Sequence, residues 1–234
     1  MTKSDLNKEK KAAAEKAVGF IESGMVVGLG TGSTVKFMIE SLAKKVKNGL
    51  DVKTVSTSNA TSKFAESLGI TVLNINDAEE IDLTIDGADE VDPNLNGIKG
   101  GGGALLYEKI VASSSRKNIW MVDSTKRVEQ LGSFPLPLEV VSFGVNQTFN
   151  KLFSLGYNPE YRSADERNYV TDGNHYIIDL HLNKIEKPDE LNNKLLQIPG
   201  VVETGLFLEI CDVLIIGADD ECKIIFKNEK RPVK

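Results

Sequence analysis

Short apolar runs alternate with helix-like segments along the first half of the chain, and this alternation restricts the possible folds more than any other feature of the sequence. Met25–Leu29 and Ile119–Val122 are the clearest runs, and each is too short for a helix. Continuous apolar runs of this length are typical of strands buried on both faces of a parallel sheet. Parallel strands need crossover connections, which helices usually supply. The alternation therefore predicts an α/β fold, with a parallel sheet and helices on both of its faces.

Helical spacing and glycine stop signals delimit the individual elements of this half. Apolar residues recur on one stripe between Thr34 and Lys47, while Gly24 and Gly69 follow two other helical segments. The expected helices cover residues 14–21, 34–47, 61–68 and 104–113. The expected strands cover residues 25–29, 53–57, 70–73, 81–85 and 119–122.

The rhythm changes near Gly132. The segment Phe134-Pro-Leu-Pro-Leu contains two prolines, which fit a linker that enters an edge strand. Asp172-Gly173 predicts a hairpin turn. The expected elements here are a strand 138–141, a helix 146–155, a strand 160–163, a hairpin of 168–171 with 176–180, a helix 188–197 and a strand 201–206. This order resembles a small ferredoxin-like α+β unit.

The last two expected strands, 213–216 and 224–226, form a hairpin around Asp219-Asp220-Glu221 and return to the first sheet. The second unit would then interrupt the first. We therefore expect a discontinuous α/β domain with a Rossmann-like parallel sheet, formed by residues 1–132 and 207–234. A smaller α+β domain, residues 133–206, is inserted in it.

Charge and composition exclude several classes of protein. The chain has 28 Lys and Arg against 34 Asp and Glu, a net charge of −6, whereas nucleic-acid-binding domains usually carry a basic excess. No apolar stretch approaches the roughly 20 residues of a membrane-spanning helix, and the charged N-terminal segment does not resemble a signal peptide. Cys211 and Cys222 make neither a disulfide framework nor a zinc site. We expect no nucleic-acid or membrane partner, and a cytoplasmic location with reduced thiols.

A glycine-rich turn, Gly28-Leu-Gly-Thr-Gly-Ser-Thr34, joins the first strand to the next helix. Backbone N–H groups at such a helix start can hold a phosphate, and Thr31, Ser33 and Thr34 add hydroxyl groups. Nucleotide motifs fit poorly, because Ser33 replaces the third glycine of the dinucleotide fingerprint and the P-loop lysine is missing. A phosphate monoester fits better, with a plain capped helix start as the alternative.

Two acidic residues, Asp86 and Asp89, follow the strand that ends at Ile85. Residues just past the carboxyl ends of parallel strands face the ligand crevice. Neighbouring carboxyl groups perturb each other's pKa, which suits proton transfer. A helix cap or a metal-binding pair is the alternative for these two residues, and we expect Glu90 and Asp92 to be solvated or structural.

Four consecutive glycines, Gly100–Gly103, follow Lys99 and lead into an expected helix. Such a run is costly in chain entropy and occurs where the backbone approaches a ligand closely. Lys99 can stabilise a developing oxyanion. A glutamate on a helix usually lies on a solvated face, but Glu108 can point back toward the loop. Its neighbours make it a candidate general base.

These segments carry a resemblance to a known family. In order and spacing, Gly-Thr-Gly-Ser-Thr, Asp-Gly-Ala-Asp-Glu and Ile-Lys-Gly-Gly-Gly-Gly-Ala-Leu-Leu-x-Glu-Lys-Ile-Val are similar to the motifs of ribose-5-phosphate isomerase, type A. Asp123-Ser-Thr-Lys126, Phe134-Pro-Leu-Pro-Leu-Glu-Val and Ile198-Pro-Gly-Val-Val-Glu-Thr-Gly-Leu-Phe207 also match that family. The resemblance therefore runs over nearly the whole chain.

The resemblance implies interconversion of D-ribose 5-phosphate and D-ribulose 5-phosphate, in the non-oxidative branch of the pentose phosphate pathway. An aldose–ketose isomerase must open the sugar ring, move a proton between C2 and C1, and stabilise a cis-enediolate. We expect Glu108 to be the base for the carbon-bound proton, and Asp86 and Asp89 to handle hydroxyl protons and ring opening. Lys99 and nearby N–H groups would hold the enediolate oxygen.

The expected substrate-binding residues are Thr31, Gly32, Ser33, Thr34, Asp86, Gly87, Ala88, Asp89, Lys99, Gly100, Gly101, Gly102, Lys126 and Lys10. Lys126 is carried over from the resemblance, and Lys10 is a candidate for the phosphate. No cofactor or metal is expected, because Lys99 and backbone amides can supply the positive charge. The resemblance also implies a homo-oligomer, a dimer or a tetramer, with the second domain as the contact surface.

Two other functions compete with the isomerase. A sugar-phosphate sensor that binds without turnover would lack the base and carry a fused DNA-binding segment, but Glu108 is present and no basic helix is left over. A CoA-transferase-like enzyme would need a nucleophilic glutamate and a larger acyl-CoA site. Neither histidine is an expected catalyst: we expect His175 at the surface and His181 at a subunit contact.

Overall fold

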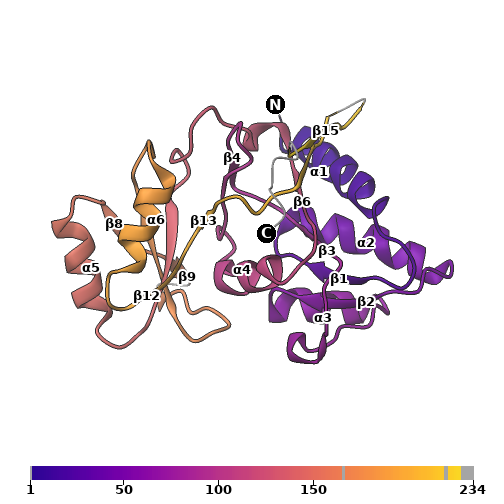
Figure 1. The fold of residues 1–234 in the computed structure, drawn as a ribbon, viewed down its shortest axis with the longest axis horizontal. Helices are drawn as coiled ribbons and strands as arrows, with labels where there is room; N and C mark the ends of the chain where they lie inside the picture. Colours follow the sequence, from indigo (N-terminus) through magenta and orange to yellow (C-terminus); the bar gives the residue numbers. More distant parts are fainter. Residues whose placement is uncertain (1, 165–166, 219–220, 228–234) are drawn as a thin grey trace, which may run out of the picture.

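The computed structural model describes residues 2–164, 167–218 and 221–227. It shows a larger part built on a six-stranded sheet and a smaller part built on a four-stranded sheet (Figure 1). The helices are α1 (Lys3–Val18), α2 (Ser33–Lys47), α3 (Asn59–Ser67), α4 (Leu105–Ser113), α5 (Val145–Ser154) and α6 (Pro188–Leu196). The first four belong to the larger part, where α4 lies on the side that faces the smaller part.

The six-stranded sheet has the order β15-β14-β6-β3-β1-β2, and only β15 runs antiparallel to its neighbour. Its strands are β1 (Val26–Leu29), β2 (Lys53–Ser56), β3 (Leu83–Asp86), β6 (Asn118–Val122), β14 (Val213–Ile216) and β15 (Lys223–Phe226). The chain passes outward from β1 to β2 and then crosses to the other side of β1 to form β3. The strand order therefore reverses between β1 and β3, which is where open α/β sheets bind their ligands.

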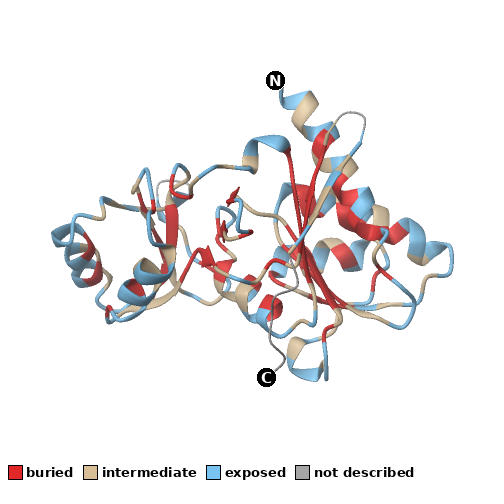
Figure 2. Cartoon of the chain, turned by 45° about the horizontal axis from the view of Figure 1, so that its top comes forward, coloured by how far each residue is buried: buried red, intermediate tan, exposed pale blue. Residues whose placement is uncertain are grey.

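Strand β6 illustrates how both faces of this sheet are buried (Figure 2). Ile119 and Met121 pack into the core beneath α1, α2 and α3. Trp120 and Val122 face the opposite core, to which Leu105 of α4 contributes. A strand buried on both faces has no polar alternation, so the short apolar runs predicted the parallel sheet correctly.

The four-stranded sheet is antiparallel and has the order β12-β7-β11-β8. Its strands are β7 (Leu136–Val140), β8 (Pro159–Tyr161), β11 (Tyr176–Leu180) and β12 (Val201–Thr204). Helix α5 follows β7 and α6 follows β11, and Leu152 and Leu195 of these helices pack on Leu138 and Ile178. This is the order of the ferredoxin-like unit expected from the sequence.

A three-stranded sheet lies between the two larger ones and consists of β4 (Glu90–Val91), β5 (Gly97–Ile98) and β13 (Leu206–Phe207). Glu90 is buried, and its carboxylate accepts hydrogen bonds from the N–H groups of Gly132 and Phe134. Its role is structural, as the sequence suggested. The remaining short elements are β9 (Ser163–Ala164), β10 (Arg167–Asn168) and the 3-10 turns η1 (Ile75–Asp77) and η2 (Ser124–Lys126).

Several boundaries differ from the sequence predictions. Helix α1 begins already at Lys3, because Thr2 and Asp5 form a capping box. The strand expected at 70–73 is wrong: the segment makes one isolated bridge, Val72 to Thr54, before the chain turns into η1. The strand expected at 201–206 is divided at Gly205 between two different sheets.

The prediction of an edge strand after the two prolines is also wrong, because β7 lies between β12 and β11. Pro137 pairs with Asp179 of β11, and its carbonyl accepts the N–H of Gly205. The N–H and the carbonyl of a strand residue point toward the same neighbouring strand. An N–H on residue 137 would therefore point toward Gly205, just past the end of β12 at Thr204. No hydrogen bond of the β7–β12 ladder is lost.

We propose that the two main sheets correspond to two domains, residues 1–132 with 207–234 and residues 133–206. The β14–β15 hairpin returns to the first sheet as predicted. Part of its expected turn, residues 219–220, lies outside the described residues, as do residues 228–234. In the described part of the chain, no helix is long and apolar enough to span a membrane.

Candidate active site

A cavity of about 260 Å³ opens beyond the carboxyl ends of β1, β3 and β6, where the strand order of the main sheet reverses. The lining residues come from the loops after these strands, the start of α2, the glycine-rich loop before α4, the first turn of α4 and the middle of α1. They are Lys10, Thr31, Gly32, Ser33, Thr34, Gly87, Ala88, Asp89, Lys99, Gly100, Gly101, Gly102, Glu108, Val122, Asp123 and Lys126.

The turn after β1 presents the start of helix α2 to the cavity. Gly32 occupies the N-cap position with φ of 123° and provides no side-chain cap, and the first turn of α2 contains no acidic residue. The N–H groups of Ser33 and Thr34 have no hydrogen-bond partner among the residues that the structure describes. A helix start with free N–H groups and no carboxylate is suited to binding an anion.

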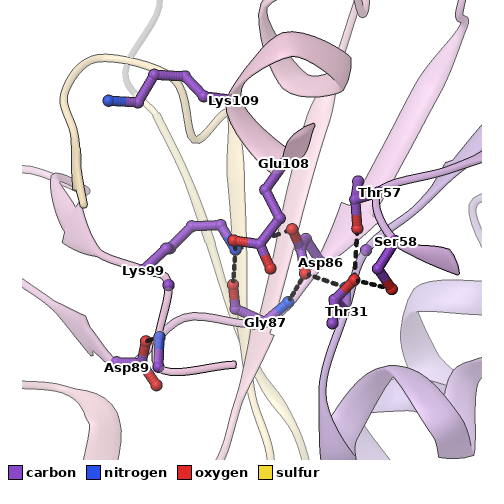
Figure 3. A network of polar contacts seen from close by, with 12 residues as sticks. Thr31, Thr57, Ser58, Asp86, Gly87, Asp89, Lys99, Glu108 and Lys109 are labelled. Atoms are coloured by element: carbon purple, nitrogen blue, oxygen red, sulfur yellow. Dashed lines mark hydrogen bonds and ion pairs between the residues drawn. The ribbon is translucent and has the colours of Figure 1, made fainter. Parts of the chain in front are cut away.

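A cluster of hydroxyl groups holds this turn from behind. The Oγ1 of Thr31 lies 2.7 Å from Oγ1 of Thr57 and 2.9 Å from Oγ of Ser58 (Figure 3). Ser58 caps helix α3, and Thr61 in the first turn donates to the carbonyl of Gly30. The hydroxyl groups therefore connect the start of α3 to the turn after β1. Sequence spacing does not reveal this connection.

Asp86, at the end of β3, is buried and joins three segments of the site. Its Oδ1 accepts the N–H of Thr31 at 3.1 Å and the N–H of Gly87 at 2.7 Å, while its Oδ2 accepts Nζ of Lys99 at 2.8 Å. A Cβ on Gly30 would lie 1.9 Å from the Asp86 carboxylate, so only glycine allows this approach. Both oxygens of Asp86 are thus engaged.

Lys99 is almost fully buried and is the cation at the centre of the site. Its Nζ lies 2.8 Å from the carbonyl oxygen of Gly87 and 3.0 Å from Oε2 of Glu108, in addition to the contact with Asp86 (Figure 3). Burial opposes the charged form, but the charges of Asp86 and Glu108 outweigh it and raise the pKa of Lys99. The ammonium group is therefore held permanently charged.

Glu108 lies in the first turn of α4 and points from it toward Lys99 and Asp86 (Figure 3). The contact of its Oε2 with Lys99 is an ion pair that is not aligned as a hydrogen bond. Burial, reinforced by the charge of Asp86, raises the pKa of Glu108 to about 8, although Lys99 acts in the opposite direction. A carboxyl group with such a pKa can both accept and return a proton near neutral pH.

Asp89 lies just after strand β3, which ends at Asp86, and its side chain is on the cavity wall. The N–H of Gly101 donates to Asp89 Oδ2 at 2.8 Å, so the glycine-rich loop holds this carboxylate in place. Two further cations, Lys10 and Lys126, line the cavity. Lys10 Nζ lies 3.2 Å from Oγ of Ser33 and 3.8 Å from the buried carboxylate of Asp123.

The structure thus gathers the predicted site residues around one cavity. Asp86 is the exception among the predicted residues, since it does not line the cavity and instead contacts Lys99 from behind. Asp123 was missed as a site residue, although it directly follows the expected strand 119–122 and its strand-end position could have revealed it. The hydroxyl partners of Thr31, which are Thr57, Ser58 and Thr61, were missed because sequence spacing does not show which side chains meet. His175 was expected at the surface, but its Nδ1 lies 3.0 Å from the buried carboxylate of Glu139 and its side chain is partly buried.

Metal binding is a second possible use of these carboxylates. Among the described residues, no group of three or more His, Cys, Asp or Glu side chains lies close enough together to hold a metal ion. The positive charge nearest to Glu108 belongs to Lys99.

Comparison with known proteins agrees with this arrangement. Residues 53–221 match the model of the family described as ribose 5-phosphate isomerase A (phosphoriboisomerase A). The chain is 49% identical over 223 residues to a ribose-5-phosphate isomerase A of Limosilactobacillus reuteri, which covers 94% of this chain and 98% of the relative.

Solved structures extend the similarity to the fold. A D-ribose-5-phosphate isomerase in complex with phospho-erythronic acid is 37% identical, with a TM-score of 0.91 over 94% of this chain and 99% of that chain. The ribose 5-phosphate isomerase of Plasmodium falciparum is 35% identical, also with a TM-score of 0.91, over 95% of this chain and 99% of that chain. Such agreement over nearly the whole length covers both sheets.

Proposed function

The chain belongs to the ribose 5-phosphate isomerase A family, and we propose that Glu108 is the base with which it converts D-ribose 5-phosphate to D-ribulose 5-phosphate. The activity is an aldose–ketose isomerisation, in which a proton moves from C2 to C1 through a cis-enediolate. The substrate is a sugar phosphate, and the cavity offers one helix start for the phosphate and one buried acid–base group for the carbon chemistry.

The phosphate group is assigned to the turn Thr31–Thr34. The unpaired N–H groups at the start of α2 and the hydroxyl of Ser33 point to an anion there, and Lys10 adds a positive charge at 3.2 Å from that hydroxyl. Lys126 is assigned to a substrate oxygen on the adjoining wall. Free amides, a helix dipole and two lysines together favour a dianion over a neutral sugar.

Proton transfer at carbon is assigned to Glu108. In its carboxylate form it removes the C2 proton of the open-chain aldose and, as the resulting acid, delivers that proton to C1. Lys99, 3.0 Å away, stabilises the negative charge that develops on the enediolate oxygen. The protonated and ionised forms of Glu108 are close in free energy. This suits a group that must first remove a proton from C2 and then deliver it to C1.

Asp86 and Asp89 have different roles in the proposed reaction. Asp86 has both oxygens occupied by two N–H groups and Lys99, so it orients the lysine and maintains its charge. Asp89 lies on the cavity wall with one oxygen held by Gly101, and it serves the hydroxyl protons and ring opening. Ala88, Gly100 and Gly102 bind the substrate through their backbone, whereas the N–H and carbonyl of Gly87 are already paired with Asp86 and Lys99 and leave it to shape the cavity wall.

One observation favours an enzyme over a sugar-phosphate sensor that binds without turnover. A sensor needs the anion site at α2, but it has no use for a buried carboxyl group whose pKa is raised to about 8 beside a buried cation. Burying such groups costs free energy, so their presence in the cavity points to a chemical function. The Glu108–Lys99 pair therefore carries the proposal.

The variant Glu108→Gln tests the assignment, because it keeps the shape and removes the exchangeable carboxyl proton. We expect kcat for ketose formation to fall by about a thousandfold or more, within the range typical of a lost general base, while inorganic phosphate still competes for the cavity. Ketose formation and exchange of the C2 hydrogen with solvent deuterium are measured together.

Glu66→Gln is the matched control, since this exposed glutamate lies on α3 and away from the cavity. It should retain the turnover of the parent chain. A Glu108→Gln variant that still exchanges the C2 hydrogen at the parent rate would show that another group is the base.

The proposal also covers the oligomeric state of the protein and its location in the cell. We propose a homo-oligomer, a dimer or tetramer, that uses the smaller part as its contact surface, because Phe143 and Phe153 there are 93% and 67% exposed. Exposed aromatic side chains of this kind are typical of protein interfaces. Two unpaired cysteines support a reducing, cytoplasmic compartment.

A further inference from the structure

An arginine of the smaller part, Arg162, contacts the glycine-rich loop, and the sequence motifs give this residue no role. Arg162 lies between β8 and β9, at the edge of the four-stranded sheet. Its backbone is fixed on both sides, since its N–H donates to the carbonyl of Ile177 and its carbonyl accepts the N–H of Tyr169. The role inferred for it below rests on the proposed isomerase function of the cavity.

The guanidinium group of Arg162 joins an anchor to the loop. Asp179 of β11 binds it in bidentate fashion, with Nε 2.8 Å from Oδ2 and Nη2 in contact with Oδ1. The Nη1 atom donates to the carbonyl of Gly100 at 2.6 Å and to the carbonyl of Gly101 at 3.1 Å. The planar arrangement of donors allows both contacts at once, which a lysine ammonium could not reproduce in the same place.

These contacts determine where the N–H groups of the loop point. In a trans peptide the carbonyl and the following N–H point in opposite directions, and the described chain contains no cis peptide bond. Because both carbonyls converge on Nη1 of Arg162, the N–H groups of Gly101 and Gly102 point away from it. The Gly101 N–H indeed reaches Asp89 at 2.8 Å, on the cavity wall.

The N–H of Gly102 is then the remaining donor on that side. It has no hydrogen-bond partner in the part of the chain that the structure describes, and Gly102 lines the cavity. Tyr169 supports the same loop, since its hydroxyl donates to the carbonyl of Gly102 at 3.2 Å. A positive charge on the carbonyl side also polarises the peptides and strengthens their N–H groups as donors.

We propose that Arg162 is a positioning residue for catalysis: it orients the Gly101 N–H toward Asp89 and the Gly102 N–H toward the oxygen that becomes negative in the enediolate. The four-stranded sheet is then part of the catalytic machinery as well as a possible assembly surface. The phosphate site at α2 lies on other segments of the cavity wall and does not depend on Arg162.

Removing the guanidinium should therefore affect the transition state more than substrate binding. For Arg162→Ala we expect kcat to fall by about ten- to a hundredfold, the loss that a displacement of reacting groups by about 1 Å produces, with KM nearly unchanged. Phospho-erythronic acid, the ligand of a similar structure, should bind more weakly by a comparable factor, whereas inorganic phosphate should bind as before. Added guanidinium ion should restore part of the lost kcat.

Arg167→Ala is the matched control, because Arg167 is an exposed arginine of the neighbouring strand β10. It should behave as the parent chain in every assay. Arg162→Lys covers the case in which Arg162→Ala does not fold: it retains the charge beside Asp179 but cannot hold both carbonyls, so its kcat should also fall.

An unchanged kcat in Arg162→Lys or in folded Arg162→Ala would overturn the proposal, as would a rise in KM with kcat unchanged. Equal weakening of phospho-erythronic acid and inorganic phosphate would overturn it too, because the phosphate site should not depend on Arg162. These outcomes leave the assignment of Glu108 untouched, since Glu108→Gln tests that assignment separately.

Discussion

Burial gives Glu108 properties that an exposed helical glutamate lacks. The ordinary pKa of such a group is 4.5, and burial together with the charge of Asp86 raises it to about 8. Lys99 limits the rise, because it stabilises the carboxylate from 3.0 Å away. The balance of these effects brings the pKa of Glu108 into the pH range in which metabolic enzymes work.

The first residue-scale prediction follows from that titration. The base acts as a carboxylate, so kcat/KM should rise with pH through the pKa of Glu108 in the free enzyme. We expect the acid limb of the profile to have its midpoint nearer to 8 than to 4.5. Initial rates of ketose formation between pH 5 and pH 9 measure it, and a midpoint at the ordinary glutamate value would contradict the assignment.

The same titration affects stability, with a definite sign. Between pH 4.5 and about 8 the folded chain retains a proton on Glu108 that the unfolded chain has released. The contribution of this group to the free energy of unfolding is therefore fully present below pH 4.5 and is lost as pH rises through about 8. Glu108→Gln removes the linkage, so its stability relative to the parent should increase across this range.

Lys99 carries the third residue-scale prediction, which concerns the source of positive charge. The ammonium group already occupies the space between Asp86 and Glu108, and a divalent metal cation at about 4 Å from it would face a repulsion of about 8 kcal/mol at an effective dielectric constant of 20. We expect full turnover after exhaustive chelation with EDTA. Lys99→Ala should lower kcat by about a hundred- to a thousandfold.

Lys44→Ala, at an exposed position near the end of α2, is the control for that series. It should leave turnover unchanged. Activity that disappears with EDTA and returns with a divalent metal would show that a metal ion, and not Lys99, is the cation of the site.

At the scale of elements, the start of α2 combines three features that are rarely found together. It has no side-chain cap, no acidic residue in its first turn and a glycine with positive φ at the N-cap. Natural helix starts are usually capped or carry Asp or Glu there, because both stabilise the helix. The uncapped N–H groups at this start are therefore available for a ligand anion.

The element-scale prediction is that Ser33→Asp stabilises the chain and weakens its substrate binding. A carboxylate in the first turn interacts favourably with the helix dipole, so the melting temperature should not fall. The same charge repels the phosphate, so KM for D-ribose 5-phosphate should rise by about tenfold or more, which corresponds to about 1.4 kcal/mol. Thermal unfolding and initial rates are measured on the same samples.

Ser33→Ala is the matched control, because it removes the hydroxyl without adding a charge. Its KM should change less than that of Ser33→Asp. Free ribose should be a poor substrate of the parent chain, and equal efficiency with ribose and its 5-phosphate would exclude a phosphate site at α2.

At the scale of the whole molecule, the two parts are joined through polar contacts as well as through the chain. Arg162 reaches the glycine-rich loop, and Asp172 of the smaller part accepts the N–H of Asn59 at the start of α3 at 2.7 Å. Ser58 beside it belongs to the hydroxyl cluster behind Thr31. Both sides of the cavity are therefore supported by the four-stranded unit.

The exposed aromatic residues of this unit lead to the whole-molecule prediction. We expect a particle mass in solution of two or four times 25.6 kDa. Replacing Phe143 and Phe153 together by Ser should lower that mass, because their exposed rings supply apolar contact area. Light scattering measures it, with the exposed Phe226 of β15 replaced by Ser as the control. A parent chain of 25.6 kDa would contradict the proposed assembly.

Much of the fold could be predicted because its signals are local. The apolar run Ile119–Val122 and the stripe on residues 34–47 report a buried strand and an amphipathic helix without reference to the rest of the chain. The strand expected at 70–73 failed because pairing depends on a neighbour, and there the chain leaves the sheet after one bridge. Pro137 led to the wrong prediction of an edge strand for the same reason. A proline is tolerated in the central strand β7 only because β12 ends beside it, so no hydrogen bond between the two strands is lost.

The sequence by itself determined most of the composition of the candidate active site. Glycine turns after strands and acids at strand ends are local patterns, and the carboxyl ends of parallel strands meet at one edge of the sheet, so the sequence alone sufficed to group Thr31 and Asp86. The run of four glycines, a second local pattern, added Lys99 and Glu108. Only the tertiary structure decided the raised pKa of Glu108 and the contacts of Arg162. Burial and the distances between charges determine a pKa, and the contact of Arg162 with Gly100 connects the edge of the four-stranded sheet to the glycine-rich loop across a sequence separation of 62 residues.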